Sequence, residues 1–137
     1  TVVVVFVTII ATFTLSFKFS NYVGKLHKDV ETYTSYKIAQ EIKNSSVENP
    51  TMFIYKIRDI GFYSNAGIAP TEKYFGLVNF DEEALPEMWQ SFKDAISNKR
   101  NDFVVTSPSI YKKEKDFLEE YYDIYKEYSD YILLIKA

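Results

Sequence analysis

Hydrophobic and polar positions divide the chain into an apolar opening segment and a mixed remainder. Residues 2–17 hold only apolar, threonine and serine side chains, and the first charged residue is Lys18. A run of this length exceeds the ~5–6 residues of an ordinary strand and approaches the roughly 20 of a helix that spans a bilayer. The pattern predicts that residues 1–22 are the last part of a transmembrane helix, followed by a juxtamembrane linker at 23–28.

The remaining residues, 29–137, alternate between helical and extended patterns. Apolar residues recur every three or four positions where helices are expected, and short β-branched and aromatic runs mark the expected strands. The helices are predicted at residues 29–43, 82–98 and 112–121. The strands are predicted at residues 52–57, 74–78, 102–106, 122–128 and 131–136. This alternation predicts a three-layer α/β domain with a small, mostly parallel sheet and a terminal antiparallel strand pair.

Composition restricts the chemistry that such a domain can carry. The chain is 47% hydrophobic and 26% charged, which is typical of a globular domain and argues against disorder. It has no cysteine, which excludes disulfides and thiolate metal sites, and its single histidine, His27, makes a histidine-based catalytic centre an unfavoured interpretation. The sequence therefore predicts no metal and no cofactor in this chain.

Charge is distributed unevenly along the chain. All 19 acidic residues lie beyond position 28, whereas Lys18, Lys25 and Lys28 follow the apolar segment closely. A domain with an excess of acidic residues is poorly suited to binding nucleic acid. The three lysines would place their end of the membrane helix in the cytoplasm if the positive-inside rule decided the topology.

Known catalytic motifs do not appear in the sequence, so no catalytic residue is predicted. The acidic groups at 81–83 and 119–120 are interpreted as a helix start and a solvated helix face. Gly61 and Gly67 miss the spacings of nucleotide-binding loops and are interpreted as turn residues, with Gly67 ending a short helix.

One loop is a candidate ligand site, because ligands of open α/β sheets bind beyond the carboxyl ends of the strands. Arg58, Asp59, Tyr63 and Asn65 follow the first predicted strand and are the candidate substrate-binding residues. Helix capping and packing use the same residue types, which is the alternative explanation for all four.

Several segments together resemble a known family. They are YKIAQEIK at 36–43, FIY at 53–55, GFYSNAGIAP at 61–70, KYF at 73–75 and DFVV at 102–105. Together they resemble the carboxyl-terminal extracytoplasmic domain of bacterial multi-pass membrane glycosyltransferases of the mannosyltransferase-like, polyprenyl-phosphate-sugar-dependent class. The resemblance covers about residues 10–137.

The resemblance implies an accessory domain of a membrane enzyme that transfers sugar from a lipid-phosphate donor. In that family the presumed catalytic acids lie between earlier membrane helices, so the resemblance implies no catalytic residue here and an inactive fragment. It also implies location at the cell membrane with residues 29–137 extracytoplasmic, which conflicts with the three lysines. The implied partners are the membrane, the rest of the parent protein, and a lipid-linked sugar or acceptor glycan.

Two other hypotheses remain open from the sequence. One is a membrane-anchored extracytoplasmic module that binds a peptide or a component of the cell envelope. The other is a small soluble α/β enzyme in which residues 1–19 form a buried strand and helix, since valine and isoleucine favour strands.

Overall fold

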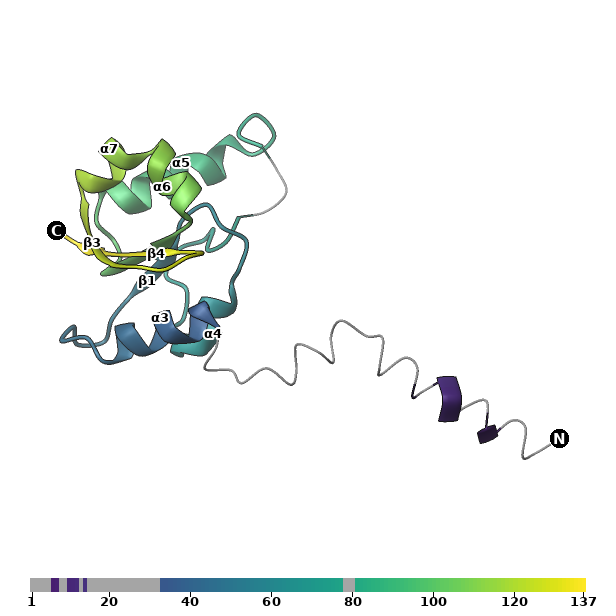
Figure 1. Ribbon diagram of the computed structural model, residues 1–137. Helices are drawn as coiled ribbons and strands as arrows, with labels where there is room; N and C mark the ends of the chain where they lie inside the picture. Colours follow the sequence, from purple (N-terminus) through teal and green to yellow (C-terminus); the bar gives the residue numbers. More distant parts are fainter. Residues whose placement is uncertain (1–5, 8–9, 13, 15–32, 78–80) are drawn as a thin grey trace. The chain divides into compact units, whose positions relative to one another are not determined.

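A computed structural model of the chain describes residues 6–7, 10–12, 14, 33–77 and 81–137 (Figure 1). The chain divides into two compact units, Thr1–Thr32 and Tyr33–Ala137. Each unit is described separately below, and the predicted linker at 23–28 lies outside the described residues.

The described residues of the first unit are helical and expose apolar side chains. Phe6, Val7 and Ile10 are 64%, 60% and 63% exposed. The Thr14 hydroxyl donates a hydrogen bond to the carbonyl of Ile10 at 2.6 Å, which satisfies the hydroxyl within the helix itself. Across the described residues, no helix combines the length and apolar character that crossing a bilayer requires.

The second unit is an α/β domain built on one four-stranded sheet. The strands are β1 (Met52–Ile54), β2 (Phe103–Thr106), β3 (Tyr122–Glu127) and β4 (Ile132–Lys136). The helices are α3 (Thr34–Lys43), α4 (Gly61–Ala66), α5 (Pro86–Ser97), α6 (Pro108–Lys113) and α7 (Lys115–Glu119). The strand order is β1-β2-β4-β3, so β1 and β3 are the two edges.

The sheet is mixed, which corrects the prediction of a mostly parallel sheet. Only β1 and β2 pair in parallel, and β4 pairs antiparallel with both β2 and β3. The terminal antiparallel pair is confirmed as β3 and β4. Its second strand inserts beside β2 in the middle of the sheet, and this placement makes two of the three pairings antiparallel.

Helices cover both faces of the sheet, so the predicted three layers are present. In Figure 1, α3 and α4 lie on one side of the sheet and α5, α6 and α7 on the other. Side chains alternate along β1: Met52 and Ile54 join the core under α3 and α4, whereas Phe53 and Tyr55 join the core under α5–α7. Because each face has its own buried cluster, residues 33–137 form a self-contained hydrophobic unit.

One predicted strand is absent from the described residues, and its segment takes another role. Residues 74–77, the described part of the strand predicted at 74–78, form no strand. The Thr71 hydroxyl bonds to the Asn101 side chain before β2, and the Leu77 N–H donates to the carbonyl of Ile57 beyond β1. The segment 71–77 is therefore held at both ends of the parallel pair. This placement brings residues 73–77 to the carboxyl end of β1.

Helix ends differ from the prediction where a cap or a turn intervenes. The predicted helix at 82–98 begins only at Pro86, because Asp81 accepts a hydrogen bond from the Ala84 N–H and closes a turn before it. Pro86 occupies the first helical turn, where its missing N–H costs little. The predicted helix at 112–121 is two shorter helices, α6 and α7, that meet at Glu114.

Candidate functional site

The carboxyl end of β1 holds a buried lysine with an unusual backbone conformation. Lys56 has φ 56°, in the left-handed region that residues other than glycine seldom adopt, and its side chain is only 8% exposed. Its ammonium lies 2.5 Å from Glu114 Oε1, and 5.0 and 5.1 Å from the ring centroids of Tyr55 and Trp89. The charge is thus paired with a carboxylate and flanked by two aromatic rings.

Glu114 completes this cluster from the break between α6 and α7. The Tyr55 hydroxyl donates to Glu114 Oε2 at 2.5 Å, so each carboxylate oxygen accepts a hydrogen bond. Burial by itself raises the pKa of Glu114, but the hydrogen bonds from Lys56 and Tyr55 outweigh it and leave the pKa below its usual value. Burial, followed by the bond to Glu114, raises the pKa of Tyr55. The cluster therefore joins the carboxyl end of β1 to the break between α6 and α7.

A small cavity of about 190 Å³ adjoins this ion pair. Tyr55, Lys93, Glu114 and Phe117 line it. The Lys93 ammonium is 3.5 Å from Glu82, and both oxygens of Glu114 already accept hydrogen bonds. The polar groups around this cavity are consequently engaged within the protein.

A second hollow, which we call the β1 groove, lies just beyond Lys56 in the sequence. It has a volume of about 360 Å³. Its lining consists of Arg58, Ile60, Lys73, Tyr74, Phe75, Gly76 and Leu77. Ile60 and Phe75 are 53% and 40% exposed, so the groove presents apolar surface to solvent.

The charged groups of the β1 groove are both basic. Within the described part of the chain, Arg58 forms no ion pair or hydrogen bond. The Lys73 ammonium lies 4.6 Å from the ring centroid of Tyr74 and 3.9 Å from Glu87. The hydrogen bond with Tyr74 and the charge of Glu87 raise the pKa of Lys73. The groove therefore offers one free guanidinium and one weakly paired ammonium beside exposed apolar groups.

Of the four predicted binding residues, the structure places one in the groove and three in supporting positions. Arg58 lines the groove. Asp59 accepts a hydrogen bond from the Gly61 N–H at 2.9 Å, at the start of α4. The Asn65 side chain donates to the Ser35 hydroxyl at 3.0 Å and so ties α4 to α3.

Tyr63 is buried next to the β1 groove and contacts Phe75, one of the residues that line it. It is 6% exposed, and its hydroxyl accepts a hydrogen bond from the Ile54 N–H at 3.4 Å. Its ring meets the ring of Phe75 edge to face at 5.9 Å. Burial raises its pKa to about 12. Tyr63 therefore positions Phe75 from within the core.

Sequence reasoning missed Lys56, Glu114, Lys73 and Phe75. A lysine inside the apolar run 52–57 is a signal of a buried, paired cation, because an unpaired one would be costly to bury. Its partner is 58 positions away and carries no local signal. Lys73 precedes and Phe75 lies within the strand predicted at 74–78, which the described residues 74–77 do not form.

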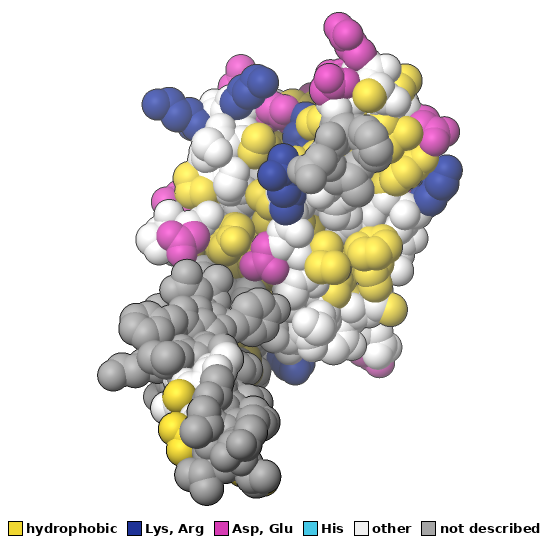
Figure 2. Space-filling model, turned by 90° about the vertical axis from the view of Figure 1, so that its right-hand side faces the viewer, with side chains coloured by type: hydrophobic (Ala, Val, Ile, Leu, Met, Phe, Trp, Pro, Cys, Tyr) yellow, Lys and Arg dark blue, Asp and Glu magenta, His cyan; other side chains and the backbone are white. Residues whose placement is uncertain are grey.

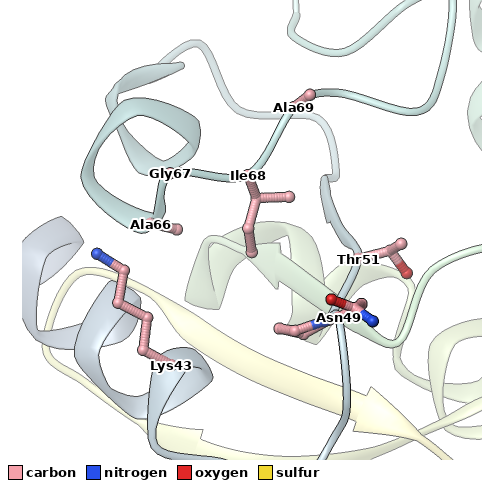
Figure 3. Close-up of a pocket in the computed structure, with 8 residues that line it drawn as sticks. Lys43, Asn49, Thr51, Ala66, Gly67, Ile68 and Ala69 are labelled. Atoms are coloured by element: carbon pink, nitrogen blue, oxygen red, sulfur yellow. The ribbon is translucent and has the colours of Figure 1, made fainter.

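A third hollow lies near the amino end of β1 (Figure 3). It measures about 480 Å³. Ile68 points toward its centre, between the side chains of Lys43 and Thr51. The Lys43 ammonium donates to the carbonyl of Asn65 at 3.1 Å, and the Thr51 hydroxyl donates to Asp102 at 2.7 Å. The side chains of Lys43 and Thr51 are thus bound within the protein.

Within the ranges that the structure describes, no three histidine, aspartate or glutamate side chains come close enough to hold a metal ion. Comparisons with protein families, with curated proteins and with solved structures found no match. Of the three hollows described above, the β1 groove is the one whose lining includes a charged side chain without a partner among the described residues, Arg58, and it suits an anion that also carries an apolar part.

Proposed function

We propose that this chain is a membrane-tethered, extracytoplasmic accessory domain of an integral membrane glycosyltransferase. Its residues 33–137 would hold a lipid-linked sugar or an acceptor glycan while the chemistry takes place elsewhere in the parent protein. The observation that carries the proposal is the β1 groove, which combines the free guanidinium of Arg58 with the exposed side chains of Ile60 and Phe75. Such a lining suits a substrate that joins a phosphate to a lipid.

The opening segment supports tethering to a membrane. Residues 2–17 contain no charge, and the described ones among them are helical. Phe6, Val7 and Ile10 expose most of their apolar surface. Exposed apolar side chains in an uncharged segment of this length suit contact with lipid or with another protein.

The coding sequence upstream of Thr1 tests the proposed parent. A multi-pass transferase requires further apolar spans before this segment, and we expect eight or more of them. A start codon directly before Thr1 would contradict the proposal, whatever the groove binds.

Replacing Arg58 in the full-length parent tests the role of the groove. We expect Arg58→Ala to lower sugar transfer at least about tenfold, the weight of one charge-assisted hydrogen bond. The amount of protein in the membrane should stay unchanged, because Arg58 is exposed and makes no ion pair or hydrogen bond within the described residues. Lys37→Ala, on the exposed face of α3, is the matched control and should transfer sugar normally. Equal transfer by the two variants would remove Arg58 from the site.

A second candidate is a membrane-anchored extracytoplasmic module that binds a peptide or an envelope component. The exposed pair Ile60 and Phe75 favours it, since apolar side chains at a groove are common anchors for peptides. An upstream sequence with a single apolar span would favour this candidate over the transferase.

A further inference from the structure

We infer that the β1 groove binds the phosphate headgroup of a membrane lipid. Arg58 and Lys73 would meet the phosphate, and Ile60 and Phe75 would lie against the hydrocarbon next to it. This inference rests on the proposed function, because it names the ligand class of the same groove.

Charge complementarity is the first argument. Both charged residues that line the groove are basic, although acidic residues outnumber basic ones over the whole chain, 19 to 16. General attraction to an anionic surface is therefore weak, and an anion must be recognised locally. The planar guanidinium of Arg58 has no partner within the described residues and can present two N–H groups to phosphate oxygens.

The second argument is the apolar surface beside the cations. Ile60 and Phe75 keep 53% and 40% of their surface exposed. Phe75 rests edge-on against Tyr63, whose hydroxyl is bonded to the backbone of Ile54, so its position is supported from the core. Because Phe75 is held in this way, it can bind hydrocarbon without a large ordering cost.

Alternative occupants use only part of this lining. Free phosphate would pair with Arg58 and Lys73 but would leave Ile60 and Phe75 in water. A neutral sugar would leave the guanidinium without a counter-charge. A lipid phosphate engages the cationic and the apolar groups together. Figure 2 shows a face of the domain on which exposed hydrophobic side chains lie beside both basic and acidic side chains.

Gly76 keeps the groove open. A Cβ at this position would lie 2.7 Å from Cγ2 of Ile60, so any larger residue would displace the Ile60 side chain. Because Ile60 is half exposed, it can move at little cost to the fold. Gly76→Ala is therefore expected to alter the groove without changing its charge.

The test uses residues 33–137, which contain both buried clusters of the domain, with far-ultraviolet circular dichroism and a melting curve to verify that each variant is folded. Binding is measured by flotation with vesicles of pure phosphatidylcholine and of four parts phosphatidylcholine to one part phosphatidic acid. We expect binding to the second vesicles only. Arg58→Glu should weaken it at least about tenfold, and Lys37→Glu should leave it unchanged.

Two further comparisons separate the contribution of the apolar side chains from that of the phosphate charge. Ile60→Thr should weaken binding severalfold, whereas Ile124→Thr, at the similarly exposed Ile124 of β3, should not. Inorganic phosphate at millimolar concentration should compete only weakly, since it lacks the hydrocarbon.

Three results would overturn the inference: no binding to vesicles with phosphatidic acid, equal binding to both kinds of vesicle, or complete competition by inorganic phosphate. Equal binding by Arg58→Glu and Lys37→Glu would also overturn it. Each of these results leaves the upstream test of the parent protein standing. Conversely, a start codon before Thr1 would end the transferase proposal while leaving lipid binding measurable.

Discussion

Two single residues, Lys56 and Glu114, decide how the carboxyl end of β1 is held. Lys56 adopts φ 56° and buries its charge against Glu114 Oε1, while the other carboxylate oxygen accepts a bond from Tyr55. Backbone strain of this kind persists only where surrounding contacts outweigh it. The ion pair supplies those contacts and sets the direction in which the chain leaves β1 toward Arg58.

Glu114→Gln should therefore destabilise the domain at neutral pH. Removing one partner of a buried pair leaves the other charge uncompensated, and we expect a loss of about 3 kcal/mol, the low end for such pairs because Glu114 is 20% exposed. The exposed Glu82→Gln should cost at most about 0.5 kcal/mol. Urea unfolding monitored by tryptophan fluorescence measures both, and similar midpoints would contradict a structural role for the pair.

The same variant should also change the dependence of stability on pH. The folded domain holds the pKa of Glu114 below its usual value of 4.5, so the carboxylate stabilises the fold at pH above that value. This contribution is lost as the pH falls through the lowered pKa, because protonation then costs the ion pair. Glu114→Gln has no such group, and its unfolding free energy should vary less between neutral and acidic pH.

Single residues also show how far sequence reasoning reaches at the candidate site. Arg58 was predicted as a binding residue from its place after a strand, and it lines the groove; whether it binds a ligand is still a prediction. Asp59 and Asn65 came from the same pattern but bond to Gly61 and Ser35. Local sequence does not distinguish these roles, because capping and binding use the same polar groups.

At the scale of elements, helices and strands with strong local patterns were predicted well. α3, α5, β2 and the β3–β4 hairpin formed where apolar spacing indicated them. The strand predicted at 74–78 is wrong for its described residues, 74–77, because a short aromatic run in a loop has the same composition as a strand. The single helix predicted at 112–121 is divided at Glu114, whose side chain is bonded to Lys56 and Tyr55.

The end of α4 offers a test at this scale. Gly67 has φ 68° at the helix C-cap, and a side chain there would meet no atom within 4 Å. Gly67→Ala should therefore cost only the backbone strain, about 1 kcal/mol in urea unfolding. Gly67→Asn should cost less, since asparagine tolerates this conformation better. A neutral Gly67→Ala would show that the helix can end in another way.

At the scale of the whole molecule, the two units differ in how far they expose apolar side chains to solvent. The described residues of the first expose apolar side chains, whereas Tyr33–Ala137 bury theirs in two clusters on either side of the sheet. The second unit has the composition and the core of an independent domain.

Residues 33–137 should accordingly unfold in one cooperative transition without detergent, since both clusters share the same sheet. The full chain of 137 residues should require detergent, because its opening segment is uncharged to Lys18. Coincident urea transitions by circular dichroism and fluorescence, together with sedimentation of both chains, would verify this. A full chain that stays monodisperse in plain buffer would contradict the proposed membrane contact.

By itself the sequence determined the apolar opening segment, the alternation of helices and strands, and an α/β domain, because hydrophobic periodicity and turn residues act over short stretches of chain. The tertiary structure alone decided that β4 lies between β2 and β3, which made the sheet mixed. It also paired Lys56 with Glu114, 58 positions away, and brought residues 73–77 beside Arg58. Strand order and such contacts depend on which buried surfaces fit together across the sheet. Local secondary-structure propensity does not specify that fit.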